Sequence, residues 1–345
     1  MDRYKRQINL PEVGTSGQQK LSNAKVLVVG AGGLGCAVLP YLVSAGIGNI
    51  GIIDEDKVDI SNLQRQVLYN EASVGTPKVE EAAKHLKKMN SELEIKTYKE
   101  FLSSKNALSI INDFDIVIDA TDNLPTRYLI NDACVLLDKP FVYGSVYRFE
   151  GQVSVFNYLN GPTYRCLFKE NNHKPVNCAE AGTLGTTVGL IGLLQANEVM
   201  KFVLETGDLL SGKLLIYDTL KNSQNIIKFK KDASISIDLE FYKREHLEKI
   251  LNMTAEEALN SNRILIDVRE LNETPIIASE KVIQLPLSDL ENQLHTLDEN
   301  QAYAVFCQHG VRSKMASNLL KKYHFNNTSN ITDGAQTIFN LINHG

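Results

Sequence analysis

Apolar residues in the first part of the chain follow two patterns, short continuous runs and longer stretches with helical spacing. A continuous apolar run is typical of a strand buried on both faces of a parallel sheet, whereas apolar positions three and four residues apart are typical of a helix. The runs predict strands at residues 25–30, 49–54, 93–100, 115–122 and 140–148. The spaced stretches predict helices at residues 33–46, 77–90 and 126–138. This alternation favours an open, mostly parallel, Rossmann-like sheet.

After Gly151 the parallel pattern gives way to an antiparallel one. Residues 151–159 and 213–218 predict antiparallel strands beside one long apolar helix at residues 183–206. Polar or charged side chains interrupt that helix at Gln195, Asn197, Glu198 and Lys201. A membrane-spanning helix tolerates few such residues, so we interpret this stretch as a buried helix of a folded domain.

A polar segment at residues 225–249 separates two predicted domains. The chain has 345 residues, which is more than one core usually organises. We expect a first domain at residues 1–235, a linker at 236–249 and a second domain at 250–345. The second domain contains two predicted strands and a helix, at residues 263–270, 302–307 and 313–323. The predicted fold class is α/β, a mostly parallel sheet with an antiparallel extension, followed by a smaller α/β domain.

Composition and charge narrow the class of protein. Apolar residues make up 43% and charged residues 22%, as in an ordinary soluble globular protein. A net charge of -5 gives no electrostatic reason to expect nucleic-acid binding, and we do not expect the protein to bind a membrane. The start, MDRYKRQINL, lacks the apolar core of a secretory signal. The cysteine count is odd and the spacing irregular, which together predict a cytoplasmic location and free thiols.

A glycine-rich loop follows the first predicted strand. The sequence GAGGLG fits the pattern G-x-G-x-x-G at Gly30, Gly32 and Gly35, with Gly33 inside it. Glycines let the backbone approach a phosphate, and the N-terminus of the helix that follows offers unpaired N–H groups. Asp54 ends the next strand, where a carboxylate can accept hydrogen bonds from ribose hydroxyls. These features predict a nucleotide site, and on their own they fit a nicotinamide dehydrogenase equally well.

Charged and amide side chains close to the glycine loop favour phosphate chemistry over hydride transfer. Residues 61–66 read SNLQRQ, Lys78 begins the next predicted helix, and Arg6 lies near the start. Hydride transfer needs an apolar nicotinamide slot, whereas nucleotidyl transfer needs cations that hold the charge on the phosphates. Asp122 ends the fourth predicted strand, where such sheets bind ligands, and its oxygens can hold Mg²⁺. The alternative is that Arg65 and Lys78 are solvated surface charges.

Six short motifs in a fixed order carry a family resemblance. RYKRQ, GAGGLG, IIDED, SNLQRQ, GTPKVE and DATDN follow one another over about residues 1–230. Together they resemble the ThiF, MoeB and HesA adenylyltransferases, which activate ubiquitin-like sulfur-carrier proteins. The resemblance implies ATP binding by Gly33, Asp54, Ser61, Asn62, Gln64, Arg65, Lys78, Asp122 and Asn123. It also implies a homodimer in which Arg6 of one protomer reaches the ATP site of the other.

The resemblance also implies a reaction. The substrate is the C-terminal Gly-Gly carboxylate of a small carrier, which attacks the α-phosphorus of ATP in the presence of Mg²⁺. Pyrophosphate leaves and an acyl-adenylate remains, a mixed anhydride far more reactive than the carboxylate. The residues implied as catalytic in this step are Arg6, Arg65, Lys78 and Asp122.

One metal site of the family is incomplete in this sequence. Many relatives hold a structural zinc ion with two C-x-x-C pairs, and residues 163–166, TYRC, correspond to the first pair. Only Cys166 is kept there, and no later C-x-x-C follows. One thiolate cannot form a four-coordinate zinc site, so we expect no zinc and a plain buried cysteine.

Cys178 lies in a polar loop with His173 and Lys174, just before the long apolar helix. Nearby cations and a helix N-terminus lower the pKa of a thiol, and the thiolate is the nucleophile. Relatives have their transfer cysteine at this position, whereas the alternative is a small core residue. Cys36 and Cys134 lie inside predicted helices among apolar neighbours and are expected in the core.

The stretch CQHGVRS, residues 307–313, places a cysteine between a strand and a helix. The N–H groups of such a loop curl around the sulfur and stabilise a thiolate or persulfide, and Arg312 adds a positive charge at the rim. The loop resembles that of rhodanese-type sulfurtransferases, as do residues 266–270, IDVRE, and residues 282–290. The family's late glycine motif is only partly kept, around Gly334. His309 is expected to face solvent.

The two resemblances imply one sequence of reactions. Cys307 carries a persulfide supplied by a donor such as a cysteine desulfurase, and this persulfide attacks the carbonyl of the carrier's acyl-adenylate. Cys178 then attacks the acyl disulfide, which releases a thiocarboxylate carrier and leaves a Cys178–Cys307 disulfide. Molybdopterin biosynthesis is the first choice of pathway, with thiamine synthesis and tRNA thiolation open. The alternatives are a nicotinamide oxidoreductase with an accessory domain and a C-terminal unit that only docks a partner.

Overall fold

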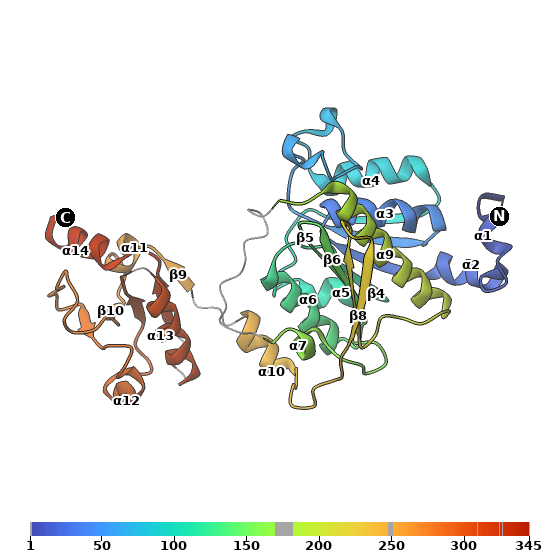
Figure 1. The fold of residues 1–345 in the computed structure, drawn as a ribbon. Coiled ribbons are helices and arrows are strands. Elements are labelled where there is room, and N and C mark those ends of the chain that lie inside the picture. Colours follow the sequence, from blue (N-terminus) through green and yellow to red (C-terminus); the bar gives the residue numbers. More distant parts are fainter. Residues whose placement is uncertain are drawn as a thin grey trace. The chain divides into compact units, whose positions relative to one another are not determined.

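The computed structural model describes residues 2–169, 182–247, 251–308, 310–323, 325 and 327–344. They form two compact units, Met1–His246 and Leu247–Gly345 (Figure 1). The first contains an eight-stranded sheet and the second a five-stranded sheet. Both are α/β units, as the sequence predicts.

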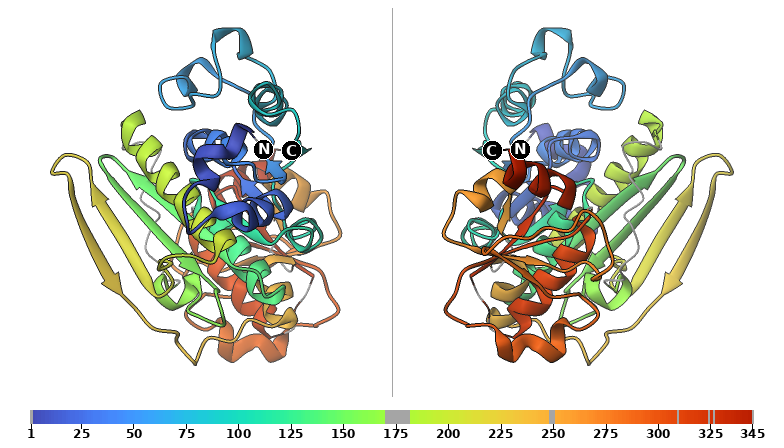
Figure 2. Two further views of the ribbon diagram at one scale, coloured as in Figure 1. Left: turned by 90° about the vertical axis from the view of Figure 1, so that its right-hand side faces the viewer. Right: turned by 90° about the vertical axis from the view of Figure 1, so that its left-hand side faces the viewer.

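The sheet of the first unit has the strand order β3-β2-β1-β4-β5-β6-β7-β8. Its strands are β1 (Lys25–Val29), β2 (Asn49–Ile53), β3 (Glu94–Tyr98), β4 (Ile116–Asp119), β5 (Phe141–Tyr147), β6 (Glu150–Phe156), β7 (Lys213–Asp218) and β8 (Ser223–Lys228). Strands β1 to β5 pair in parallel, and β5 to β8 pair antiparallel. In Figure 2, β6 and the β7–β8 hairpin lie side by side at one edge of this sheet, in green and yellow. The predicted parallel sheet and its antiparallel extension are therefore confirmed.

Helices cover the two faces of this sheet. They are α1 (Lys5–Ile8), α2 (Gly14–Asn23), α3 (Gly33–Ala45), α4 (Lys78–Met89), α5 (Ala107–Asn112), α6 (Leu124–Leu136), α7 (Tyr164–Leu167), α9 (Gly185–Leu204) and α10 (Leu239–Tyr242). Short helical turns add η1 (Asp2–Tyr4), η2 (Ile60–Asn62), η3 (Glu71–Ser73) and η4 (Lys243–Leu247). The helices predicted at residues 33–46, 77–90, 126–138 and 183–206 are confirmed within a few residues.

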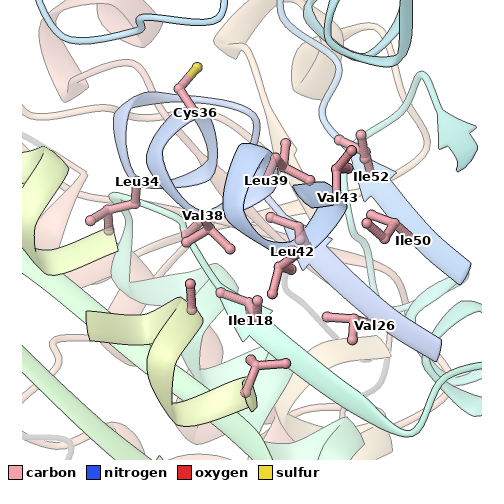
Figure 3. Packing of buried hydrophobic residues seen from close by; sticks show 14 of the residues in the cluster. Val26, Leu34, Cys36, Val38, Leu39, Leu42, Val43, Ile50, Ile52 and Ile118 are labelled. Carbon is pink, nitrogen blue, oxygen red and sulfur yellow. The ribbon is translucent and has the colours of Figure 1, made fainter. Parts of the chain in front are cut away.

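The parallel strands bury side chains on both faces, which explains their continuous apolar runs. Val26 and Val28 of β1 belong to one core cluster, and Leu27 and Val29 belong to another on the opposite face. Figure 3 shows the first cluster, where Val38, Leu39, Leu42 and Val43 of α3 lie against Val26, Ile50, Ile52 and Ile118 of the strands. Burying each such side chain stabilises the fold by roughly 1.5–3 kcal/mol. This packing fixes the glycine loop at the start of α3.

Helix α9 is long and apolar enough, by length and composition, to cross a membrane. In the structure it packs against α3, and its polar residues Gln195 and Glu198 are buried and hydrogen-bonded. Gln195 Nε2 donates to the carbonyl of Asp119, and Glu198 Oε2 accepts from the N–H of Leu210. Its apolar character is thus accounted for by packing inside the first unit.

Two features of the first unit differ from the sequence prediction. Strand β8 (Ser223–Lys228) was not predicted, because it is an edge strand with every residue exposed and so carries no apolar pattern. The segment expected as a linker, residues 236–249, contributes α10, and its residues Tyr242 and His246 are buried in the first unit. The linker prediction therefore needs correction over residues 239–246, which pack on α6 through these side chains.

The second unit is built on an all-parallel sheet with the order β11-β10-β12-β13-β9. The strands are β9 (Leu251–Met253), β10 (Ile264–Asp267), β11 (Val282–Gln284), β12 (Tyr303–Phe306) and β13 (Thr328–Ile331). The helices are α11 (Ala255–Leu259), α12 (Leu290–Gln293), η5 (Leu294–Thr296), α13 (Val311–Lys322) and α14 (Ala335–His344). The strands predicted at residues 263–270 and 302–307 and the helix at 313–323 are confirmed.

Candidate active sites

A cavity of about 470 Å³ opens at the C-terminal ends of β1, β2 and β4. From β1 the chain continues to β2 and β3 on one side, and β4 then lies on the other side of β1. This is the switch point where open α/β sheets bind ligands. Its walls combine the glycine loop, charged side chains and an apolar patch around Phe101. Such a mixed wall suits a nucleotide, which has a phosphate end and an apolar base.

The glycine loop brings backbone to the cavity because side chains cannot fit there. Gly30 has φ +101°, and a Cβ on it would lie 2.6 Å from the carbonyl oxygen of Ala120. A Cβ on Gly35 would lie 2.1 Å from the carbonyl oxygen of Gly30. Gly30, Gly32 and Gly33 line the cavity, whereas Gly35 lies outside the lining and serves the tight turn into α3. The loop therefore presents open backbone, as phosphate binding requires.

Asp54 is fixed by two backbone donors at the end of β2. The N–H of Ala31 donates to its Oδ2 (2.7 Å), and the N–H of Asp56 donates to its Oδ1 (2.8 Å). Burial raises the pKa of this carboxyl above its usual range. Each oxygen retains lone-pair capacity toward the cavity, so the structure is consistent with the predicted acceptor for ribose hydroxyls.

Lys78 and Arg65 place cations on the cavity wall. Lys78 is only 5% exposed, and its Nζ lies 2.7 Å from Asp56 Oδ2. The alternative reading of Lys78 as a solvated surface charge is therefore wrong. Arg65 is half-buried, lines the cavity and donates from Nη1 to the carbonyl of Ser61 (3.1 Å). Asp56 was not singled out from the sequence, although its place two residues after Asp54 is a signal for it.

The remaining predicted nucleotide residues divide into two groups. Asp122 and Asn123 line the cavity on the β4–α6 turn, where Asn123 Oδ1 also caps α6 by accepting from the N–H of Thr126. Three others lie outside the lining, on or just after η2: Ser61, Asn62 and Gln64. Arg6 is exposed on α1 and also lies outside the lining. The trans role implied for Arg6 stays a prediction.

A buried pair beside the cavity was missed by the sequence reasoning. Arg127 lines the cavity and is 8% exposed, and its Nε lies 3.7 Å from Oδ2 of the fully buried Asp119. Among the residues that the structure describes, neither of these two atoms has a hydrogen-bond partner. Burial raises the pKa of Asp119, although Arg127 and Thr121 oppose the shift. The position of Arg127, one turn into the helix after DATDN, was the available signal.

Another unpaired atom lines the same cavity. Gln66 is 3% exposed, and its Oε1 has no hydrogen-bond partner within the described part of the chain. Buried polar atoms are normally paired, and leaving one unpaired costs about 1–3 kcal/mol. Unpaired atoms on Gln66 and Arg127, two residues that line one cavity, therefore point to a polar ligand that would supply partners.

The cysteines of the first unit lie in different environments. Cys36 and Cys134 are fully buried, as predicted, and burial raises the pKa of Cys36 to about 12, so neither is a ready nucleophile. Cys166 is half-buried, and its sulfur accepts from the N–H groups of Thr163 and Asp232 (3.4 Å each). Among the described residues no cluster of three metal-ligating side chains occurs. Cys178 lies outside the described residues, so its role stays a prediction.

In the second unit, Cys307 lies between β12 and α13 and is 2% exposed. Its sulfur donates to Ser313 Oγ (3.5 Å), and its carbonyl accepts from the N–H of Ala335 (3.1 Å). Gly310 has φ +78° at the N-cap of α13, a conformation that favours glycine. A Cβ on Gly334 would lie 2.4 Å from the carbonyl oxygen of Gln308, which explains why this glycine of the late motif is kept. His309 lies outside the described residues.

Arg312 does not stand alone at the rim of the Cys307 loop. Its Nη1 and Nη2 contact the two carboxylate oxygens of Glu273, at 2.5 and 2.8 Å. Hydrogen bonds from Arg312 lower the pKa of Glu273 to about 2. The sequence could not reveal this partner, because it lies 39 residues away in a loop without a recognisable pattern.

The sequence of this chain is similar to those of known adenylyltransferases. The "Adenylyltransferase and sulfurtransferase MOCS3" of Aedes aegypti is 42% identical over 350 residues, which cover 91% of this chain and 80% of that protein. The "Sulfur carrier protein adenylyltransferase" of Thermus thermophilus is 49% identical over 230 residues, covering 65% of this chain and 85% of that protein. The first match covers more of the chain than the first unit supplies, so it extends into the second unit.

A solved structure has the same fold as the first unit. The crystal structure of E. coli MccB with ATP is 26% identical, has a TM-score of 0.57 and covers 64% of this chain and 67% of that chain. The model of the ThiF family matches residues 4–236, which include the whole cavity wall. The chain therefore belongs to the ThiF family.

Proposed function

We propose that this chain activates the C-terminal Gly-Gly carboxylate of a ubiquitin-like sulfur carrier with ATP and then transfers sulfur to it from Cys307. The observation that carries the proposal is the cavity at the end of β1, where open backbone, Lys78 and Arg65 meet unpaired buried polar atoms. Sequence similarity to proteins named adenylyltransferase and sulfurtransferase supports both activities. The same similarity favours molybdopterin biosynthesis as the pathway.

ATP would lie with its phosphates on the glycine loop and its ribose toward Asp54. Backbone N–H groups at the start of α3 and the Lys78 ammonium would hold the phosphates, since both favour negative charge. Carboxylates of Asp122 and Asp56 on the wall are the ligands that Mg²⁺ prefers, so the residues present fit this ion. When bound, Mg²⁺ would reduce the charge on the phosphates as pyrophosphate leaves.

The carrier's carboxylate would approach from the side of Asp122 and Arg127. A guanidinium matches a carboxylate geometrically, and Arg127 Nε is buried without a hydrogen-bond partner within the described chain. The carboxylate oxygen would bond to the α-phosphorus while pyrophosphate departs. In a homodimer, Arg6 of the second protomer would add positive charge at this step.

In the second half-reaction a persulfide on Cys307 would attack the acyl carbonyl, and AMP would leave. A persulfide donor such as a cysteine desulfurase would load Cys307, and Cys178 would release the thiocarboxylate by forming a disulfide with Cys307. A reducing, cytoplasmic setting suits this chemistry, because the Cys178–Cys307 disulfide must be reduced before the next cycle.

ATP–pyrophosphate exchange in the presence of a purified Gly-Gly-ended carrier tests the first half-reaction. Lys78→Ala is expected to lower exchange about a hundredfold, because a preorganised charge on the phosphates is lost. Lys84→Ala is the matched control on the same helix, since Lys84 is exposed, and it should keep the exchange rate. Equal rates for both variants would contradict the role of the cavity.

A further inference from the structure

We propose that Glu273 selects the sulfur donor. By neutralising Arg312 at the rim of the Cys307 loop, it makes the loop accept sulfur from a persulfide carried on a protein cysteine and disfavours small dianions such as thiosulfate. The inference rests on the proposed sulfurtransferase function of the second unit and deepens it by naming a residue that sets the choice of donor.

The carboxylate of Glu273 is held in place by three donors. Arg312 Nη1 and Nη2 donate to its two oxygens, and the N–H of Glu270 donates to its Oε1 (2.9 Å). The N–H of Glu273 in turn donates to the carbonyl of Glu270 (3.0 Å), which closes a tight turn. Because the turn itself orients the carboxylate, the pair with Arg312 is preorganised rather than a chance contact of two long side chains.

The turn is tied to buried residues of the second unit. Arg269, which is fully buried, binds Asp267 through Nε and Nη2 and also donates from Nη2 to the carbonyl of Pro275 (2.9 Å). Its Nη1 reaches Oε1 of Gln308, the residue after Cys307 (3.4 Å). One buried guanidinium thus links the segment that follows Glu273 to the cysteine loop.

The charges at the rim do not favour a dianion. Arg312 interacts electrostatically with Glu273, Cys307 and Glu270, and Arg269 is already neutralised by Asp267. Among the described residues, one cation at the rim faces two carboxylates, which gives a net negative charge. Thiosulfate carries two negative charges and would be repelled, whereas a persulfide on a cysteine carries at most one.

The chemistry balances for both donors. The Cys307 thiolate attacks the outer sulfur of a donor persulfide, R–S–S–H, forming the new S–S bond, and the donor leaves as R–S⁻. With thiosulfate the same attack breaks the S–S bond to the sulfonate, sulfite leaves with the electron pair, and Cys307 retains a persulfide anion. Cyanide then removes the sulfur as thiocyanate. Only the approach of the donor differs, which is the step that Glu273 would control.

The test compares the full-length chain with Glu273→Gln, which keeps an oxygen acceptor for the N–H of Glu270 but removes the charge. Two rates are measured: thiosulfate-to-cyanide transfer, followed as thiocyanate, and loading of Cys307 by a purified cysteine desulfurase with radiolabelled cysteine. The ratio of kcat/KM for thiosulfate to that for the desulfurase should rise about fivefold to tenfold, mainly through a lower KM for thiosulfate. Glu299→Gln, on an exposed loop of the same unit, is the control of equal charge and should leave the ratio unchanged.

A purely structural role predicts other outcomes. Glu273→Gln would then lower both rates together or leave the ratio unchanged, and either result overturns the proposal. Glu273→Asp, which keeps the charge, should restore the ratio of the original chain. In the unaltered chain, added salt should raise kcat/KM for thiosulfate, since it screens repulsion, and a fall would also overturn the proposal. Pyrophosphate exchange with the carrier tests the proposed function separately, because it depends on the first unit.

Discussion

The two reactive regions of this chain differ in how their charged side chains are paired. At the cavity of the first unit, Arg127 Nε and Gln66 Oε1 have no hydrogen-bond partner among the described residues. Around Cys307, in contrast, Arg312 is bound by Glu273 and Arg269 by Asp267. Unpaired buried groups cost free energy unless a ligand completes them, whereas ion pairs that are already formed need no ligand.

This difference indicates that the two units have different functions. The first unit is built to bind a large polar substrate and to stabilise charge that appears only during reaction. The second is built to hold one reactive sulfur in a small loop, with Arg312 already bound by Glu273. Substitutions should therefore act on binding and catalysis at the cavity, but on chemistry and donor choice at the loop.

The largest effect should follow Cys307→Ser. Formation of the thiocarboxylate carrier should fall at least a thousandfold, about the loss seen when a covalent nucleophile is removed, because serine cannot carry a persulfide. ATP–pyrophosphate exchange should continue at the original rate, since the cavity lies in the other unit. Mass spectrometry of the carrier gives the first readout and exchange of labelled pyrophosphate the second.

Cys166→Ser is the matched control for that experiment. Cys166 is a half-buried thiol that accepts backbone hydrogen bonds, a role that a hydroxyl can also fill. Both activities should persist in this variant. If Cys307→Ser formed the thiocarboxylate at the original rate with sulfide excluded, the assignment of sulfur transfer to the second unit would be wrong.

Arg127→Gln should lower pyrophosphate exchange about a hundredfold. Arg127 lines the cavity, so the loss should appear in the reaction more than in folding. Arg148→Gln, at an exposed position, is the control. If Arg127→Gln lost stability but kept the exchange rate of folded protein, the pair with Asp119 would be structural and the comparison would fail.

Sequence reasoning succeeded where burial or backbone geometry dictates residue type. Strands β1, β2 and β4 were predictable because both faces are buried, which leaves a continuous apolar run. The glycine loop was predictable because no Cβ fits at Gly30 or Gly35. Strand β8 was not, since an exposed edge strand needs no apolar pattern.

The candidate sites were predictable only in part, for a physical reason. Asp54 and Cys307 directly follow strands and Lys78 begins a helix, so their place in the chain fixes their place in the fold. Pairing is different, because the Arg312–Glu273 contact joins residues 39 apart through loops whose paths depend on the whole unit. The same holds for Arg127 and Asp119, which meet only once α6 packs on the sheet.

A third cluster of charged side chains is buried in the first unit, and its members are hydrogen-bonded to one another. Asp132 of α6 accepts from Arg165 Nε and Nη2 (2.7 Å each), and His246 Nε2 lies 2.6 Å from its Oδ2. Arg165 also lies over the rings of Tyr128 and Phe241. This cluster holds the last residues of the first unit onto α6, so its loss should affect folding rather than catalysis.

Asp132→Asn should lower the free energy of unfolding by about 3 kcal/mol, the cost of leaving a buried guanidinium without its counter-charge. Burial alone would raise the pKa of Asp132, but hydrogen bonds from Arg165 and His246 outweigh it and lower the pKa. The carboxylate therefore stabilises the fold above its unfolded pKa of about 3.9, and this stability is lost as pH falls through the folded value. Denaturant unfolding should show a large difference between variant and original at neutral pH that shrinks below about pH 4. Asp138→Asn, at an exposed position just past the same helix, is the control and should change neither the stability nor its pH dependence. Pyrophosphate exchange by folded Asp132→Asn should stay close to that of the original chain. A hundredfold loss of exchange would instead place this paired cluster among the catalytic groups.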